Sequence, residues 1–285
     1  MNDKIAGKFR GTGVKAGLMY GMAEFYGGGA FVIINTFFLV FLTKALGMPA
    51  ALAGAIPMVG KVWDAITDPM MGNITDRTSS RFGPKRLYIL IGGILSAIAF
   101  ISLWTTIPSR STTVQFIYYM VMYCLFSTCF TIIMVPYNGL LPDMVDSYDI
   151  RSKFSSLRMI WSTVGAILAG LVPTLMIKDT LNTSMYLKVA IIFGILFGFA
   201  AVVTFIGTWE KVKPPVKTKL RDSFSEASSV LRSRSFKIFI GIYLSGQCAM
   251  DFVSGMAIYY VDDVLGGYDK GYLTMLMGVL LSSQL

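Results

Sequence analysis

Residues 61–86, KVWDAITDPMMGNITDRTSSRFGPKR, decide the fold. This stretch begins in an apolar segment that holds two carboxylates, Asp64 and Asp68, and it ends in a basic loop. Four residues are about one helical turn, so both acids project from the same helix face. An acid in a membrane helix is costly unless it faces a partner or water, so such a residue is first interpreted as functional. The rest of the sequence must show whether this is a membrane helix.

The composition indicates a membrane protein. The chain is 54% hydrophobic and 14% charged, with a mean hydropathy of +0.63, whereas about 25% of the residues of a soluble domain are charged. The apolar residues form runs of about the 20 residues that a spanning helix needs. The net charge of +9 is spread over short loops between these runs, which argues against a nucleic-acid partner.

The sequence also excludes several kinds of chemistry. It has no histidine, the commonest general base and metal ligand, and its three cysteines lie in apolar segments without metal-ligand spacing. No nucleotide-binding loop and no removable signal peptide are present. We therefore expect a protein that is not an enzyme and that has no cofactor.

Seven apolar runs are predicted as membrane spans, at about 16–43, 50–75, 87–106, 113–137, 155–177, 185–209 and 238–261. An eighth run starts near Tyr272 and stops at Leu285, too short to span. The fold class is thus all-α and polytopic: a six-helix bundle over 1–209, a basic linker over 210–237 and the start of a second bundle over 238–285. This layout is typical of the first half of a twelve-helix transporter made of inverted three-helix repeats. We expect the chain to be C-terminally truncated.

The basic residues predict the orientation in the membrane. With the N-terminus inside, 19 of the 25 Lys and Arg residues fall in the inner loops and the linker. Because inner loops carry the excess of Lys and Arg, the N-terminus is predicted to be cytoplasmic. We also expect the protein to be embedded in the cell membrane, in contact with its lipids.

Asp64 and Asp68 form the strongest candidate site. Asp64 is twelve residues from Asp76 in the inner loop, about 18 Å along a helix, which places it near mid-membrane. Hard cations prefer oxygen ligands, so the pair can bind Na⁺, or one acid can bind a proton. The structural alternative pairs Asp68 with Lys61 and leaves Asp64 in a wet vestibule.

Other polar residues inside the spans have two interpretations each. Glu24 can bind substrate hydroxyls or couple to protons, or it can be a buried partner of Arg158 or Lys61. Asn35 and Asn138 can read sugar hydroxyls, because amides donate and accept, or they can join helices. Asp251 lies within the seventh run, where it can line a cavity or pair with another helix.

The loop after the acids has a conformational and a topological interpretation. Gly72 allows close helix approach, and Asp76 can hold a helix end or a basic partner. Together with Arg77, Arg81 and Gly83, these residues are predicted to form a latch and an orientation signal that does not contact substrate.

Three blocks carry a family resemblance: YGMAEF at 20–25, WDAITDPMMG at 63–72 and DRTSSRFG at 76–83. The chain resembles the glycoside–pentoside–hexuronide:cation symporter family of the major facilitator fold over nearly its whole length. The resemblance implies that Asp64 and Asp68 are Na⁺ or H⁺ ligands and that Thr131 supplies a hydroxyl. Thr67 stands where the family has a polar neighbour of these acids.

The resemblance is uneven at the substrate site. Arg158 matches an arginine near the sugar, but the two aspartates that hold a galactoside in melibiose permease fall on Gly28 and Met134, and its tryptophan falls on Asn138. We therefore expect a cation-coupled symporter for a small sugar or glycoside other than a melibiose-like galactoside, acting as a monomer. The alternatives are a Na⁺-coupled transporter of a lipid-like solute and an inactive truncated membrane protein.

Overall fold

A computed structural model describes residues 13–109, 111–210 and 233–264, and every structural statement below concerns these residues. Their regular structure is entirely helical. The α-helices are α2 (Val14–Ile33), α3 (Ala50–Arg77), α4 (Arg86–Leu103), α5 (Thr112–Asn138), α6 (Leu141–Met144), α7 (Tyr148–Met176), α8 (Thr183–Gly207) and α10 (Arg234–Tyr259). Three π-helical segments complete the set: η1 (Ile34–Phe38), η2 (Phe41–Ala45) and η3 (Tyr260–Val264).

The helices match the predicted spans closely. Six segments are long and apolar enough to cross a membrane: 14–38, 86–103, 112–138, 148–176, 183–207 and 234–253. The predicted second span, α3, is 28 residues long but is not among them, because Lys61, Asp64 and Asp68 interrupt its apolar sequence. Most of the predicted linker and the whole eighth run lie outside the described residues.

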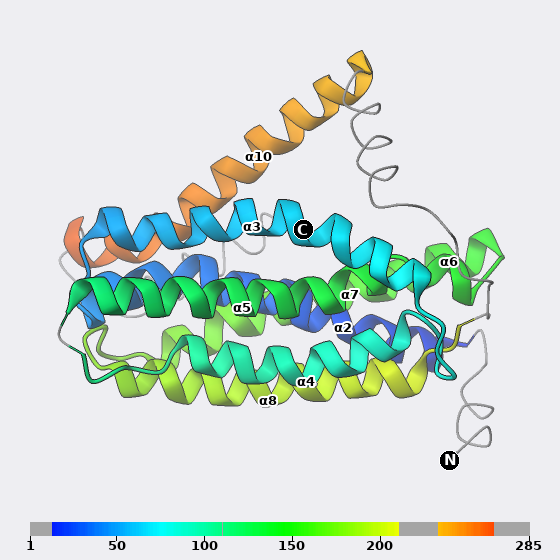
Figure 1. The fold of residues 1–285 in the computed structure, drawn as a ribbon, viewed down its shortest axis with the longest axis horizontal. Helices are drawn as coiled ribbons and strands as arrows, with labels where there is room; N and C mark the ends of the chain where they lie inside the picture. Colours follow the sequence, from blue (N-terminus) through cyan, green and yellow to red (C-terminus); the bar gives the residue numbers. More distant parts are fainter. Residues whose placement is uncertain (1–12, 110, 211–232, 265–285) are drawn as a thin grey trace.

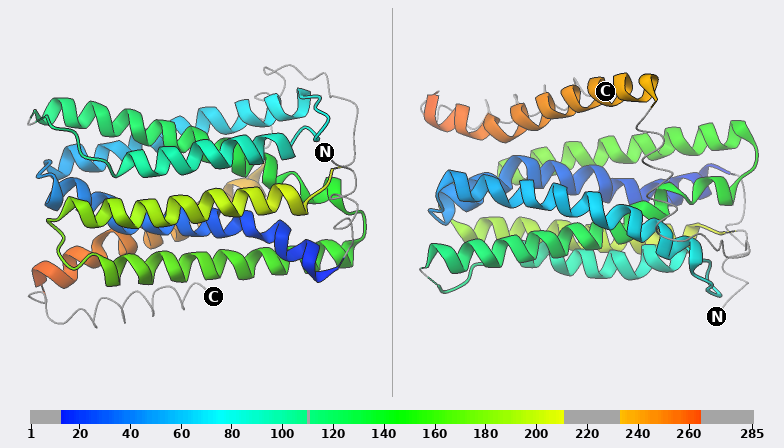
Figure 2. Two further views of the ribbon diagram at one scale, coloured as in Figure 1. Left: turned by 90° about the horizontal axis from the view of Figure 1, so that it is seen from below. Right: turned by 45° about the horizontal axis from the view of Figure 1, so that its top comes forward.

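The first six long helices pack as two related triplets. Helix α2 packs against α7 and α8, while α5 packs against α3 and α4, and α4 packs against α8. If α2 is exchanged with α5, α3 with α7 and α4 with α8, the same set of helix contacts results. Since α2 and α5 run in opposite directions, the triplets form the inverted repeat expected from the sequence. Figures 1 and 2 show these helices side by side along the long axis.

Small residues set how closely the triplets approach. A Cβ atom on Gly28 would lie 2.7 Å from the Ser162 hydroxyl, and one on Gly165 would lie 2.5 Å from the Phe25 carbonyl oxygen. Both distances are shorter than a van der Waals contact, so α2 and α7 meet backbone to backbone. Gly28 therefore cannot be replaced by an acid without moving α7.

The bundle has two chemically different ends. At one end lie Arg77, Arg81, Lys85, Arg86, Arg151 and Lys153, and we call this the basic end. The other end, with the segments 46–49, 104–109 and 177–182, is called the opposite end. Helix α10 approaches the other helices near the opposite end and diverges from them toward the basic end (Figure 1).

Candidate functional site

The two acids of α3 lie against α5, and a glycine positions them. A Cβ atom on Gly60 would lie 2.1 Å from Cε1 of the Tyr123 ring, so only glycine admits this close approach. One and two turns further along α3, Asp64 and Asp68 reach side chains of α5. The close approach that we expected at Gly72 was wrong, because a Cβ atom there would meet only Val135, at an ordinary 3.9 Å.

Each acid receives a hydrogen bond from a hydroxyl of α5. The Thr131 hydroxyl donates to Asp68 at 2.7 Å, and the Ser127 hydroxyl donates to Asp64. The acids and the hydroxyls are both four residues apart, and α3 and α5 run in the same direction, so the two helices in contact bring them together in pairs. These two pairs, the acid–hydroxyl pairs, present carboxylate and hydroxyl oxygens, which suit Na⁺ or a proton.

The remaining predicted cation residue is not part of these pairs. The Thr67 hydroxyl donates to the Trp63 carbonyl oxygen of its own helix at 3.2 Å. Ser127 was missed from the sequence, although its spacing of four from Thr131 repeats the spacing of the acids. No three Asp, Glu, His or Cys side chains gather in the part of the chain that the structure describes, so the arrangement there is two acids with two hydroxyls.

A second polar cluster joins three helices near the basic end. The Arg158 guanidinium donates from Nε to Glu24 at 2.9 Å and from Nη2 to Asn138 at 2.6 Å. It also lies 4.8 Å above the centre of the Tyr137 ring. Glu24 is thus the partner of Arg158, which was one of the two interpretations of this acid. The exposed fractions of the two charged side chains, 26% for Arg158 and 16% for Glu24, leave both accessible to a ligand.

A third cluster joins α10 to the first bundle. The Lys61 ammonium lies 2.5 Å from Oδ2 of Asp251, and the Asn35 amide donates to Oδ1 of the same carboxylate at 3.1 Å. Lys61 therefore pairs with Asp251, and the pairing of Lys61 with Asp68 that we considered is not formed. Asn35 therefore joins η1 to α10. Asp251 forms the ion pair with Lys61 and also faces the cavity described in the next paragraph.

All three clusters border one cavity of about 670 Å³ between α10 and the first bundle. This volume falls within the 300–1,000 Å³ typical of small-molecule sites. Its polar and charged lining residues are Glu24, Asn35, Thr36, Lys61, Asp64, Tyr123, Asn138, Arg158, Ser162, Tyr243, Gln247 and Asp251. Asp64 is therefore the member of the acid–hydroxyl pairs that faces the cavity, while Ser127, Asp68 and Thr131 lie outside its lining, as does Thr67.

The loop residues lie away from this cavity at the basic end. Asp76, Arg77 and Arg81 are exposed. Gly83 adopts a φ of +95°, which favours glycine. The role of these residues as a latch stays a prediction.

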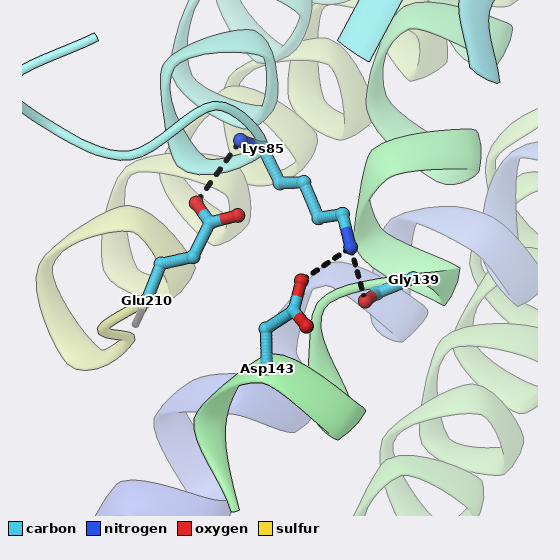
Figure 3. A network of polar contacts seen from close by, with 4 residues as sticks. All are labelled: Lys85, Gly139, Asp143 and Glu210. Atoms are coloured by element: carbon cyan, nitrogen blue, oxygen red, sulfur yellow. Dashed lines mark hydrogen bonds and ion pairs between the residues drawn. The ribbon is translucent and has the colours of Figure 1, made fainter. Parts of the chain in front are cut away.

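Lys85, which the sequence presented only as a loop charge, takes part in a polar network at this end (Figure 3). Its ammonium lies 2.5 Å from buried Asp143 and 2.7 Å from the Gly139 carbonyl oxygen. Its backbone N–H donates to Glu210 at 3.0 Å, directly after α8. Burial of the Glu210 carboxylate raises its pKa above the usual value. This network joins the α3–α4 loop, the α5–α6 turn and the end of α8.

Comparison with known proteins agrees with this architecture. The family model for the MFS/sugar transport protein family matches residues 19–285. The chain is 38% identical over 158 residues to an uncharacterized symporter, sll1374, of Synechocystis, covering 53% of this chain and 29% of that protein. It is 25% identical over 214 residues to the isoprimeverose transporter of Lactiplantibacillus pentosus, covering 71% and 44%.

A solved structure shares the fold. The structure of a D-xylose–proton symporter superposes with a TM-score of 0.56 at 14% identity, covering 94% of this chain and 65% of that one. The chain spans half or less of the length of the two relatives named above. The chain therefore belongs to the MFS/sugar transport protein family, in its glycoside–pentoside–hexuronide:cation symporter group, and is an integral membrane protein of the major facilitator fold.

Proposed function

We propose that this protein is a secondary active transporter that carries a small sugar or glycoside together with Na⁺ or H⁺. The observation that carries the proposal is the position of Asp64, which is bound to the Ser127 hydroxyl and faces a polar cavity. A cation held there lies beside the space that a substrate would fill. Binding of one therefore affects binding of the other.

The cavity chemistry supports a polyhydroxylated substrate. Sugar hydroxyls both donate and accept hydrogen bonds, and the amides of Asn138 and Gln247 and the Glu24–Arg158 pair supply both functions. The rings of Phe31 and Phe130 add apolar surface of the kind that packs on sugar faces. Gly28 and Met134 leave no acid at the positions of the galactoside-binding aspartates, so a melibiose-like substrate is not expected.

The asymmetric placement of α10 supports alternating access. In the described structure, α10 contacts the first bundle near the opposite end and leaves the cavity bordered by exposed residues toward the basic end. We assign the basic end to the cytoplasm, following the excess of Lys and Arg there. Transport would proceed by rocking of the two bundles about the cavity.

The proposal has further components. The driving force is an ion gradient and no organic cofactor takes part. The protein acts as a monomer in the cell membrane with a cytoplasmic N-terminus, and it does not catalyse a chemical reaction.

The test is uptake by the full-length protein in proteoliposomes. The panel comprises pentosides, hexosides, uronides and, for the lipid-like alternative, a lysophospholipid, each with Na⁺, Li⁺ and pH varied separately. We expect accumulation of at least one sugar that depends on a Na⁺ or H⁺ gradient. Asp64→Asn and Asp68→Asn should abolish the gradient dependence while membrane insertion stays intact. Undiminished gradient-driven accumulation in both variants would refute the cation site.

A further inference from the structure

Helix α10 touches the first bundle through one end only. Its residues near the basic end are exposed, with exposed fractions of 64% for Phe239 and 60% for Tyr243. Near the opposite end, Ile258 of α10 and Val261 of the following η3 are buried, with exposed fractions of 2% and 5%. Figure 1 shows α10 approaching the first bundle near the opposite end, and we call this end of the cavity the covered end.

The contact on this covered end combines the buried apolar residues Ile258 and Val261 with several polar contacts. The polar contacts are the Lys61–Asp251 ion pair, in which the Lys61 side chain is 65% exposed, the Asn35–Asp251 hydrogen bond, and a 2.5 Å hydrogen bond between the hydroxyls of Thr43 and Tyr259. Asn35 belongs to η1 and Thr43 to η2, so both contacts come from wide π-helical turns, which are frequent at functional sites. A few polar contacts of this kind can form and break as a unit.

Lys61 has a second carboxylate within reach. Asp64 follows Lys61 by three residues on α3, a spacing that makes two side chains neighbours on a helix surface. Both residues line the same cavity. The hydrogen bond that Asp64 receives comes from Ser127, a neutral donor, so the negative charge of Asp64 attracts any nearby cation. The Lys61 ammonium and a coupling ion therefore compete for the same carboxylate.

We propose that Lys61 couples cation occupancy to closure of the covered end, an inference that rests on the function proposed above. Without a coupling ion, the Lys61 ammonium turns toward Asp64, and the contact with Asp251 loosens. With an ion at Asp64, Lys61 is repelled from it and binds Asp251, which holds α10 against η1. Lys61 is thus a positioning residue for ion coupling. Linkage makes the effect reciprocal: closing this end raises the ion affinity of Asp64.

The experiment measures access from the side of the opposite end. A single cysteine replaces Val32, which lines the cavity on α2, in full-length protein that lacks its other cysteines. A membrane-impermeant thiol reagent is added outside right-side-out vesicles, with and without a saturating coupling ion, Na⁺ or low pH. No substrate is needed. Lys188→Gln, a change to an exposed lysine of α8, is the matched control.

Two variants should respond in opposite directions. In the parent and in Lys188→Gln, the ion should slow labelling about 5-fold or more, the lower range of coupling between sites. Lys61→Gln should label fast with or without the ion, because Asp251 has lost its partner. Asp64→Asn, which mimics a neutralised carboxylate, should label slowly in both conditions. Misfolding would not move the two variants in opposite directions.

The outcomes separate this inference from the proposed function. If Lys61→Gln keeps the ion response of the parent, or Asp64→Asn labels fast, the role of Lys61 is refuted while ion coupling stands. If the parent itself does not respond to Na⁺ or to pH, ion coupling at Asp64 is refuted, and the inference falls with it.

Discussion

Gly60→Ala should damage the candidate cation site without touching any of its ligands. The new Cβ atom would lie 2.1 Å from Cε1 and 2.5 Å from Cδ1 of the Tyr123 ring. Carbon atoms in contact are about 3.5–4.0 Å apart. The ring cannot simply turn aside, because it is 7% exposed and packs on Phe38 with ring centres 5.5 Å apart. The relief must come from movement of α3 away from α5 by roughly 1.5 Å.

This movement breaks the acid–hydroxyl pairs. The Thr131–Asp68 hydrogen bond of 2.7 Å would lengthen to about 4 Å, beyond the 3.2 Å limit of an effective bond. The Ser127–Asp64 bond would open in the same way. A hydrogen bond to a charged group contributes about 1.5–3 kcal/mol, which corresponds to about 10- to 100-fold in affinity for each pair. We therefore expect at least a 10-fold loss of apparent cation affinity.

The assay is the concentration of Na⁺ or H⁺ that gives half-maximal uptake, with the melting temperature measured in detergent. The melting temperature should fall as well, because overpacking a well-packed contact costs about 1–3 kcal/mol. Gly54→Ala is the matched control, since it lies on the same helix and its Cβ would meet nothing within 4 Å. An unchanged cation dependence in folded Gly60→Ala would refute the reasoning, because it would mean that the α3–α5 spacing does not set the site.

Four further predictions follow from single contacts. Ser127→Ala removes the donor to Asp64 and should weaken apparent cation affinity about 10-fold in the uptake assay. Arg158→Lys should lower apparent sugar affinity with little change in cation dependence, because one ammonium cannot bind Glu24 and Asn138 as the guanidinium fork does. Gly83→Ala should lower the melting temperature, since its φ is +95° and its Cβ would lie 2.3 Å from the Glu210 carboxylate. Burial raises the pKa of Glu210 in the folded protein, so the stabilising contribution of this carboxyl is present at low pH and is lost as pH rises through that pKa. The melting temperature of Glu210→Gln should therefore vary less with pH than the melting temperature of the parent.

The structure corrects the sequence interpretation where a distant partner decides a role. Glu24 had two candidate partners in the sequence, and packing of α2 against α7 selects Arg158. Lys61 was considered for Asp68 on its own helix, yet it pairs with Asp251, 190 residues away. Gly72 and Gly60 look alike in the sequence, and the tight contact falls at Gly60. Each outcome depends on the register between helices, which no local pattern contains.

The sequence alone determined the helical membrane fold, the ends of most helices and the shared face of Asp64 and Asp68. These properties follow from the length of apolar runs and from the helical period, which act between residues near in sequence. The tertiary structure decided that Ser127 joins the site, that Thr67 does not, and that Lys61 reaches α10. These properties require two helices at a fixed distance and register, and this distance is set by packing at Gly60, one turn before Asp64 on α3.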